Sequence, residues 1–393
     1  MATSAEILRA YRGPALFSYG FRPFFLGGAI WAVTAMALFV AVLWGGLYMP
    51  TTFHPVDWHV HELLFGYVPA VAAGFLLTAV PNWTGRLPIA GTPLAALFEI
   101  WLAGRAAVAF SGLIGAGPAA AIDLAFLAVF SAVIAREIIA GRNTRNLKVL
   151  VLLGLLTLGN AVFHVEAATR GSADYGKRFG VGAVILLIML IGGRIVPSFT
   201  RNWLARQNPG ALPAPFGRFD SGAIAIGAAA IALWVLLPDN PATAIAAVIA
   251  GGVHLVRLAR WRGLRTFNEP LVTVLHAGYA FIPLGFLLLA LSIAAPESLS
   301  PAAAAHGWTA GAVGLMTMAV MTRATLGHVG REMTASRAIL AIYMAVGVGA
   351  IARILAGFGV EPDLMLKIAA LGWILAFGGF VCVFGPLLGR ARG

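Results

Sequence analysis

Long apolar runs follow one another along almost the whole chain, and they constrain the fold more than any other feature. Each run has about 19 to 26 residues, close to the roughly 20 that a helix needs to cross the hydrocarbon core of a bilayer. The sequence therefore predicts an all-α fold, a polytopic integral membrane helical bundle with about twelve transmembrane helices. The predicted spans lie near 24–48, 62–80, 93–114, 118–140, 147–168, 178–200, 220–238, 241–262, 269–294, 301–325, 337–358 and 363–388.

Composition and spacing favour one membrane domain. The chain of 393 residues is 60% hydrophobic and only 11% charged, and a soluble domain of this size does not hide so much apolar surface. The longest segments between the predicted spans are 201–219 and 49–61, and neither is long enough to fold separately. We therefore predict a single transmembrane domain over residues 1–393, with no sequence repeat strong enough to claim.

The distribution of positive charge predicts the orientation. With twelve spans both termini lie on one side, and twenty Lys and Arg residues fall on that side, Arg9 and Arg392 among them, against four on the other. Because positive residues concentrate on the cytoplasmic side, we expect both termini in the cytoplasm. The formal net charge of +12 is then a topology signal, with membrane lipid as a partner and no role for nucleic acid.

Histidine is the main candidate for holding a metal. The only cysteine, Cys382, lies in the last apolar run, which excludes disulfides and cysteine-held zinc or iron–sulfur sites within the chain. The predicted topology sorts the eight histidines into two layers. The outer layer holds His54, His59, His61, His164 and His306, and the inner layer holds His254, His276 and His328.

Five histidines at one depth on three different spans point to a shared site, although a single histidine at a span end is most often interfacial. Polar side chains inside a membrane are costly, and imidazole suits haem iron and copper. His59 and His61 are two residues apart, so in a helix they point about 200° away from each other. They can therefore hold one centre together only if the helix begins at or after His61.

Carboxylates and arginines also occur in or beside the predicted spans. Glu62 adjoins the two histidines, where a carboxylate can orient a ligand or carry protons. Asp123, Glu99 and Arg105 lie within apolar runs, and we expect them to pair with groups on other spans.

Several motifs together resemble the NnrS family of haem- and copper-containing membrane proteins of denitrifying and nitric-oxide-exposed bacteria. The strongest are WHVHELLFGY at 58–67 and AVMTRATLGHVGR at 319–331. The others are FRPFFLGG at 21–28, AGFLLTAVPNWTGR at 73–86, GNAVFH at 159–164, GGRIVPSFTRNWL at 192–204 and LHAGYAFIPLG at 275–285.

The resemblance implies a protein of the bacterial inner (cytoplasmic) membrane that carries haem, of b type, and copper. It also implies cofactor ligands at matching positions. These are His59, His61, His164 and His306 for an outer cluster and His276 and His328 for an inner one. His54 and His254 fall outside the matched motifs.

Three functions are compatible with these features. The leading hypothesis is a nitric oxide reductase-like oxidoreductase that binds nitric oxide and takes part in its reduction or detoxification. Its electrons would come from quinol or a donor protein, because the sequence has no c-type haem motif. The second is a haem- or metal-binding sensor or nitric oxide sink without turnover, and the third is a secondary transporter.

Overall fold

The structure, a computed structural model, describes residues 11–207 and 210–390 of the chain. Arg9 and Arg392, which contributed to the predicted orientation, lie outside these residues. Throughout the described part the secondary structure is helical, and it contains no strand. The predicted all-α class is therefore confirmed.

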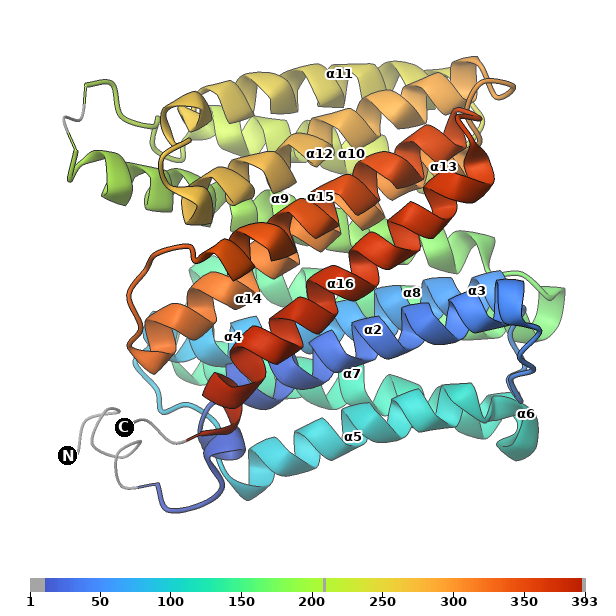
Figure 1. The fold of residues 1–393 in the computed structure, drawn as a ribbon, viewed down its shortest axis with the longest axis horizontal. Helices are drawn as coiled ribbons and strands as arrows, with labels where there is room; N and C mark the ends of the chain where they lie inside the picture. Colours follow the sequence, from blue (N-terminus) through green and yellow to red (C-terminus); the bar gives the residue numbers. More distant parts are fainter. Residues whose placement is uncertain (1–10, 208–209, 391–393) are drawn as a thin grey trace. The chain divides into compact units, whose positions relative to one another are not determined.

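Contacts between helices divide the chain into two compact units. The first unit comprises Met1–Gly180, Met321–Arg331 and Phe377–Gly393. The helices that lie wholly within it run from blue to green in Figure 1. They are η1 (Ala15–Ser18), α2 (Phe21–Gly45), α3 (Pro55–His61), η2 (Glu62–Tyr67), α4 (Val68–Thr84), α5 (Thr92–Ala109), α6 (Ser111–Ile114), α7 (Ala116–Ala140), η3 (Thr144–Asn146) and α8 (Leu147–Arg170).

The second unit comprises Val181–Val320 and Glu332–Ala376. Three helices have residues in both units: α9 (Asp174–Leu204), α14 (Gly314–Val329) and α16 (Pro362–Gly389). The remaining helices of the second unit are α10 (Arg218–Leu236), α11 (Pro241–Ala259), η4 (Gly263–Arg265), α12 (Pro270–Ala294), α13 (Pro301–His306), η5 (Gly307–Val313) and α15 (Arg337–Gly357).

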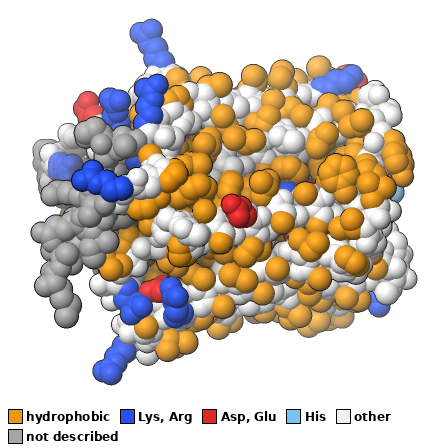
Figure 2. Space-filling view, turned by 90° about the horizontal axis from the view of Figure 1, so that it is seen from below, with side chains coloured by type: hydrophobic (Ala, Val, Ile, Leu, Met, Phe, Trp, Pro, Cys, Tyr) orange, Lys and Arg blue, Asp and Glu red, His pale blue; other side chains and the backbone are white. Residues whose placement is uncertain are grey.

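Eleven helical segments among the described residues are long and apolar enough to cross a membrane, which confirms a polytopic bundle. Figure 2 shows the matching surface, where hydrophobic side chains cover most of the face and lysines and arginines lie towards its ends. The predicted span 301–325, the tenth along the chain, is not among the eleven. It forms as α13, η5 and α14 in direct succession, from Pro301 to Val329.

The helix that carries the His-x-His motif begins earlier than predicted. We expected the span to start near residue 62, but α3 starts at Pro55 and continues through η2 into α4. His54 is the N-cap, and its side chain accepts a hydrogen bond from the amide of Val56. Proline at the first helical position is favoured because its fixed φ suits the helix and its missing N–H needs no partner there. The sequence His54–Pro55 therefore starts the helix.

Two stretches share a local plan: the first lies in the first unit, and the second begins in the second unit and ends within Met321–Arg331 of the first. In each, a helix that begins with proline ends at a histidine, a π-helical segment follows at once, and an α-helix continues. His61 precedes Arg86 by 25 residues, and His306 precedes Arg331 by 25 residues. The glycines before these arginines, Gly85 and Gly330, both have positive φ, at 70° and 76°. π-Helical turns are rare and frequently occur at functional sites.

Candidate metal centre

His61 lies at the centre of a buried polar cluster in the first unit. It is the last residue of α3 and is fully buried. Its Nδ1–H donates to Glu62 Oε1 at 2.9 Å. Its Nε2 lies 3.0 Å from Asn160 Oδ1 and 3.3 Å from Asp123 Oδ2. The Nε2 side of the ring therefore faces α7 and α8, while Glu62 fixes the opposite nitrogen.

Asp123, in the middle of α7, joins the groups of this cluster. Its Oδ2 accepts a hydrogen bond from Asn160 Nδ2 at 2.7 Å and lies 3.0 Å from His164 Nε2. Asn160 and His164 are four residues apart on α8 and so lie on the same face of that helix. Both are buried. One carboxylate thus connects α7 to α8 and, through His61, to α3.

Arg105 on α5 completes the cluster. Its guanidinium donates to Glu62 Oε2 at 2.6 Å and also contacts Asp123 Oδ1, and the side chain is only 2% exposed. Gly66 in η2 allows this approach, because a Cβ at that position would lie 2.3 Å from Arg105 Nη1. The carbonyl of Gly66 accepts a hydrogen bond from Trp101 Nε1 at 2.9 Å, which packs α5 against the π segment.

The charges of the cluster do not cancel when both imidazoles are neutral. Glu62 and Asp123 contribute two negative charges, and Arg105 contributes one positive charge. A net negative charge buried among apolar groups is costly unless a cation balances it. Either a proton on His61 or a bound metal ion supplies that cation.

Three side chains offer their ligand atoms to one point. One atom each from His61, Asp123 and His164 lies within 4.8 Å of the other two, and all three residues are buried. In the absence of a metal, Asp123 Oδ2 accepts from His164 Nε2–H at 3.0 Å, and a proton on His61 Nε2 is shared between Asn160 Oδ1 at 3.0 Å and Asp123 Oδ2 at 3.3 Å. A metal ion replaces such protons when it binds, because its ligands must be deprotonated. Two imidazoles and a carboxylate are a donor set suited to copper, zinc or iron.

Aromatic side chains surround the imidazoles. The ring centroid of His61 lies 5.2 Å from that of Phe53, 5.5 Å from Phe65 and 5.2 Å from Phe163. The ring of Phe53 also lies 5.4 Å from His164. These rings keep water away from the polar cluster, so its electrostatic interactions are stronger than they would be in water.

His59 lies away from this cluster. Since α3 begins at Pro55, His59 and His61 are both helical, and the condition under which they would share one centre is not met. The ring of His59 stacks on Phe39 of α2, with centroids 4.0 Å apart and planes 17° apart. His54, at the start of the helix, is exposed and caps it.

The other predicted ligands are distributed over both units. His328 belongs to the first unit, where its ring packs against Tyr19 and Phe21 with centroids 5.5 and 5.3 Å away. His306 belongs to the second unit, and its Nδ1–H donates to the carbonyl of Ala302 at 2.7 Å.

His276, also in the second unit, has a defined tautomer. Thr200 Oγ1 donates to Val196 O at 2.8 Å, so it accepts from His276 Nε2–H at 2.7 Å. Nδ1 of His276 is therefore an acceptor, and it is buried without a hydrogen-bond partner. A Cβ at residue 263 would lie 2.5 Å from this nitrogen, so Gly263 packs directly against it.

Sequence reasoning did not identify Asp123 as a ligand. It singled out Asp123 and Arg105 only as charges that pair with other spans, and that pairing is confirmed. Asn160 was not identified as a partner of Asp123 either, although it precedes His164 by four residues in the motif GNAVFH. A carboxylate in the middle of the apolar run 118–140 was the available signal, because such residues are rare in membranes and mark functional sites.

Comparison with known protein families gives a match over nearly the whole chain. The family described as NnrS protein matches residues 15–392. A search of curated proteins gave no match. The family match extends over every residue of the buried cluster.

Proposed function

The chain belongs to the NnrS family, and on that premise we propose that it binds nitric oxide at a copper centre and takes part in its reduction. The centre consists of His61, Asp123 and His164. The observation that carries the proposal is the convergence of these three buried ligand atoms within 4.8 Å of one another.

The net charge of the buried cluster favours copper over a metal ion that is always divalent. The cluster of Glu62, Asp123, Arg105 and two neutral imidazoles carries one net negative charge, which cuprous copper balances. Cupric copper leaves one net positive charge, so only the oxidised state of a one-electron cycle is unbalanced, and by a single charge. When bound, copper supplies a one-electron couple and an open position for a small ligand.

The protein's own residues have distinct tasks in this proposal. Glu62 accepts the Nδ1–H of His61 at 2.9 Å and so presents Nε2 to the centre. Arg105 holds both carboxylates in place, and the phenylalanine rings exclude water. Reduction of two nitric oxide molecules to nitrous oxide and water consumes two electrons and two protons. Glu62 is the carboxylate best placed to transfer protons, and quinol or a donor protein supplies the electrons.

Haem, which the family resemblance also implies, fits this region less well. The described cavity beside His59 and His61 has a volume of about 180 Å³. Sites for organic ligands usually have about 300–1,000 Å³. The proposal therefore assigns His61 and His164 to copper and gives haem no role at this centre.

The proposed location is the bacterial inner membrane, with both termini in the cytoplasm. The eleven apolar helical segments support a multi-pass membrane protein. The excess of lysine and arginine on one side of the predicted topology supports the orientation. Cysteine accessibility labelling at the exposed positions Asp174 and Arg337, which this topology places on opposite sides, tests it in intact cells.

The test is metal analysis of the purified full-length protein and two variants. We expect copper in the wild type and its loss in His164→Gln and Asp123→Asn. The control His54→Gln changes an exposed capping histidine and should keep the metal. Wild-type protein should then consume nitric oxide when given a reductant. Copper retained in both cluster variants would rule the site out, whereas copper without nitric oxide consumption would indicate a sensor or sink.

One observation favours a second candidate, a secondary transporter. Both units contain a proline-initiated helix, a histidine and a π segment in the same order, and repeated units are common in transporters. A substrate that stabilises metal-free protein would support transport. The buried polar cluster occurs around only one of these stretches among the described residues, which is why we place it second.

A further inference from the structure

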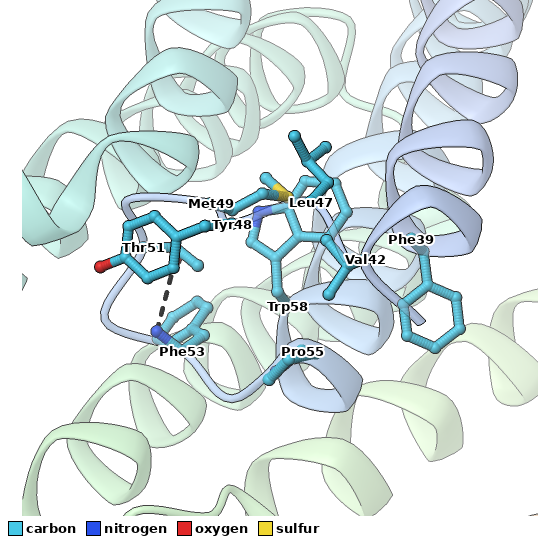
Figure 3. A pocket seen from close by; sticks show the side chains of 9 residues that line it. All are labelled: Phe39, Val42, Leu47, Tyr48, Met49, Thr51, Phe53, Pro55 and Trp58. Carbon is cyan, nitrogen blue, oxygen red and sulfur yellow. Dashed lines mark hydrogen bonds between the residues drawn. The ribbon is translucent and has the colours of Figure 1, made fainter. Parts of the chain in front are cut away.

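An apolar cavity lies beside the copper centre proposed above. Its volume is about 180 Å³, and it lies between the end of α2, the segment 46–54 and the start of α3. Figure 3 shows the side chains that line it. All of the segments that contribute to the lining belong to the first unit. The lining residues are Phe39, Val42, Leu47, Tyr48, Met49, Thr51, Phe53, Pro55 and Trp58.

Two of the lining rings contact the histidines. Phe53 lines the cavity, and its ring also packs against His61 and His164, with centroids 5.2 and 5.4 Å away. Phe39 lines the cavity and stacks on His59. The ring of Phe53 therefore stands between the cavity and the two imidazoles of the centre.

The segment that carries Phe53 is held by hydrogen bonds. The amide of Phe53 donates to Thr51 Oγ1 at 3.3 Å, the dashed line in Figure 3. Thr51 Oγ1 lies 3.1 Å from Ser111 Oγ, which also accepts from the amide of Thr52 at 2.8 Å. The backbone around Phe53 is thus fixed, and rotation of its side chain is the simplest way to open a path.

One polar group in the lining lacks a partner. Trp58 is 1% exposed, and its Nε1–H has no hydrogen-bond partner in the structure. Figure 3 shows its indole ring among the lining side chains, with the nitrogen towards Met49. A buried donor without an acceptor is costly. An occupant of the cavity that accepts one weak hydrogen bond removes part of that cost.

Size and chemistry restrict the occupant. An apolar cavity of about 150 Å³ stays dry and binds benzene or xenon, and a buried water needs about 2–4 polar partners. The polar side chains of this lining are those of Tyr48 and Thr51 and the indole of Trp58, whose N–H is itself buried. Leu47 and Tyr48, which are 43% and 84% exposed, form its rim. The cavity therefore suits a small, uncharged molecule that partitions into the membrane and can accept one weak hydrogen bond.

We propose that this cavity is an access chamber for nitric oxide, in which Trp58 Nε1–H orients the molecule and Phe53 controls its passage to His61 and His164. The identity of the gas rests on the proposed function. The chamber itself rests on the cavity, the unpartnered indole and the position of Phe53.

Xenon tests the chamber without the metal. In full-length protein in nanodiscs, we expect a saturable ¹²⁹Xe NMR shift that Val42→Phe and Leu47→Trp abolish, because both side chains line the cavity. Leu43→Phe is the matched control: it adjoins Val42 on α2 but is 48% exposed and does not line the cavity. Absence of a saturable shift in the wild type, or an equal shift in the filled variants, would overturn the proposal.

Nitric oxide itself tests the occupant. Because it is paramagnetic, it should broaden the indole ¹H–¹⁵N resonance of Trp58, which Trp58→Phe identifies by its disappearance. Broadening that is no stronger than at the other tryptophans would overturn the assignment of nitric oxide to the chamber. Copper content measured on the same samples separates the two proposals, because a metal-free protein that binds xenon and nitric oxide here refutes the copper centre and retains the chamber.

Discussion

Each unit buries an arginine, an aspartate and a histidine, but the two clusters differ in charge and in what the histidine faces. In the first unit Arg105 contacts two carboxylates, Glu62 and Asp123. In the second unit Arg257 on α11 pairs with Asp220 on α10, at 2.9 Å. The first cluster therefore has a surplus negative charge, and this second pair is balanced.

In the cluster of the second unit, both ring nitrogens of His254 take part in hydrogen bonds. Arg257 donates to the hydroxyl oxygen of Tyr279 at 2.7 Å, and we assign the tyrosine O–H as the donor to His254 Nδ1 at 2.9 Å. His254 Nε2–H then donates to the carbonyl of Ala223 at 3.1 Å. No lone pair of this imidazole remains for a metal.

The difference teaches how to separate a structural cluster from a candidate metal centre. Both are buried and ionic, so burial and charge alone do not identify a site. What distinguishes the first unit is a surplus charge together with imidazole nitrogens that face the same carboxylate oxygen. A cation satisfies both features, whereas the second cluster is already satisfied by the protein.

The largest effect should come from breaking the balanced pair. Asp220→Asn leaves the Arg257 guanidinium, which is 0% exposed, without its counter-charge. Removing one partner of a buried ion pair typically costs about 3–5 kcal/mol. We expect that loss of unfolding free energy in a denaturant titration in micelles, with copper content per folded molecule unchanged. A copper content that falls with Asp220→Asn would show that the second cluster is not merely structural.

The next effect tests the surplus charge of the first cluster. Glu62→Gln keeps the shape of the side chain but removes a negative charge and the carboxylate that fixes His61 Nδ1–H. Loss of such a supporting group usually lowers metal affinity about 10–100-fold. Competition titration with a copper chelator measures it. Glu99→Gln, an exposed glutamate on α5, makes the same chemical change outside the cluster and should leave the affinity unchanged.

Hydropathy was sufficient to predict the bundle but not the cluster. Runs of apolar residues located the spans because the length of a membrane helix is set by the thickness of the bilayer. The partners of Asp123 depend on how α3, α5, α7 and α8 pack, and no local pattern in the sequence carries that information. The shared plan of the His61 and His306 stretches was also missed, since it lies in spacing and π-helical backbone rather than in similar residues.

The position of His59 could have been predicted better. His54–Pro55 is a recognisable helix start, and with the helix beginning there His59 and His61 must point in different directions. The clear apolar run begins only at residue 62, so the helix start at residue 55 was concealed. The residues before the run include Asp57 and the histidines His54, His59 and His61, which are polar. Polar residues at the start of a span lower its hydropathy without preventing a helix.

A smaller effect should come from the packing around Arg257. A Cβ at Gly193 on α9 would lie 2.1 Å from Arg257 Nη2, so Gly193→Ala forces the guanidinium to shift. Overpacking of this kind typically costs about 1–3 kcal/mol. Gly222→Ala on α10, where nothing lies within 4 Å, is the matched control and should not destabilise the protein. Equal unfolding free energies for the two variants would mean that Arg257 is not tightly held.

The smallest effect should come from an ion pair that solvent reaches. Lys367 Nζ lies 2.6 Å from Asp363 Oδ2 on α16, but the two side chains are 55% and 70% exposed. Exposed pairs contribute about 0.2–1 kcal/mol, so Asp363→Asn should change the unfolding free energy by less than about 1 kcal/mol. Asp220→Asn is the same substitution in the same unit, and only burial separates the two. If both variants lose equal stability in the same titration, the contribution of the Arg257–Asp220 pair does not depend on its burial. The contrast between this balanced cluster and the first cluster, which requires a cation, would then lose its physical basis.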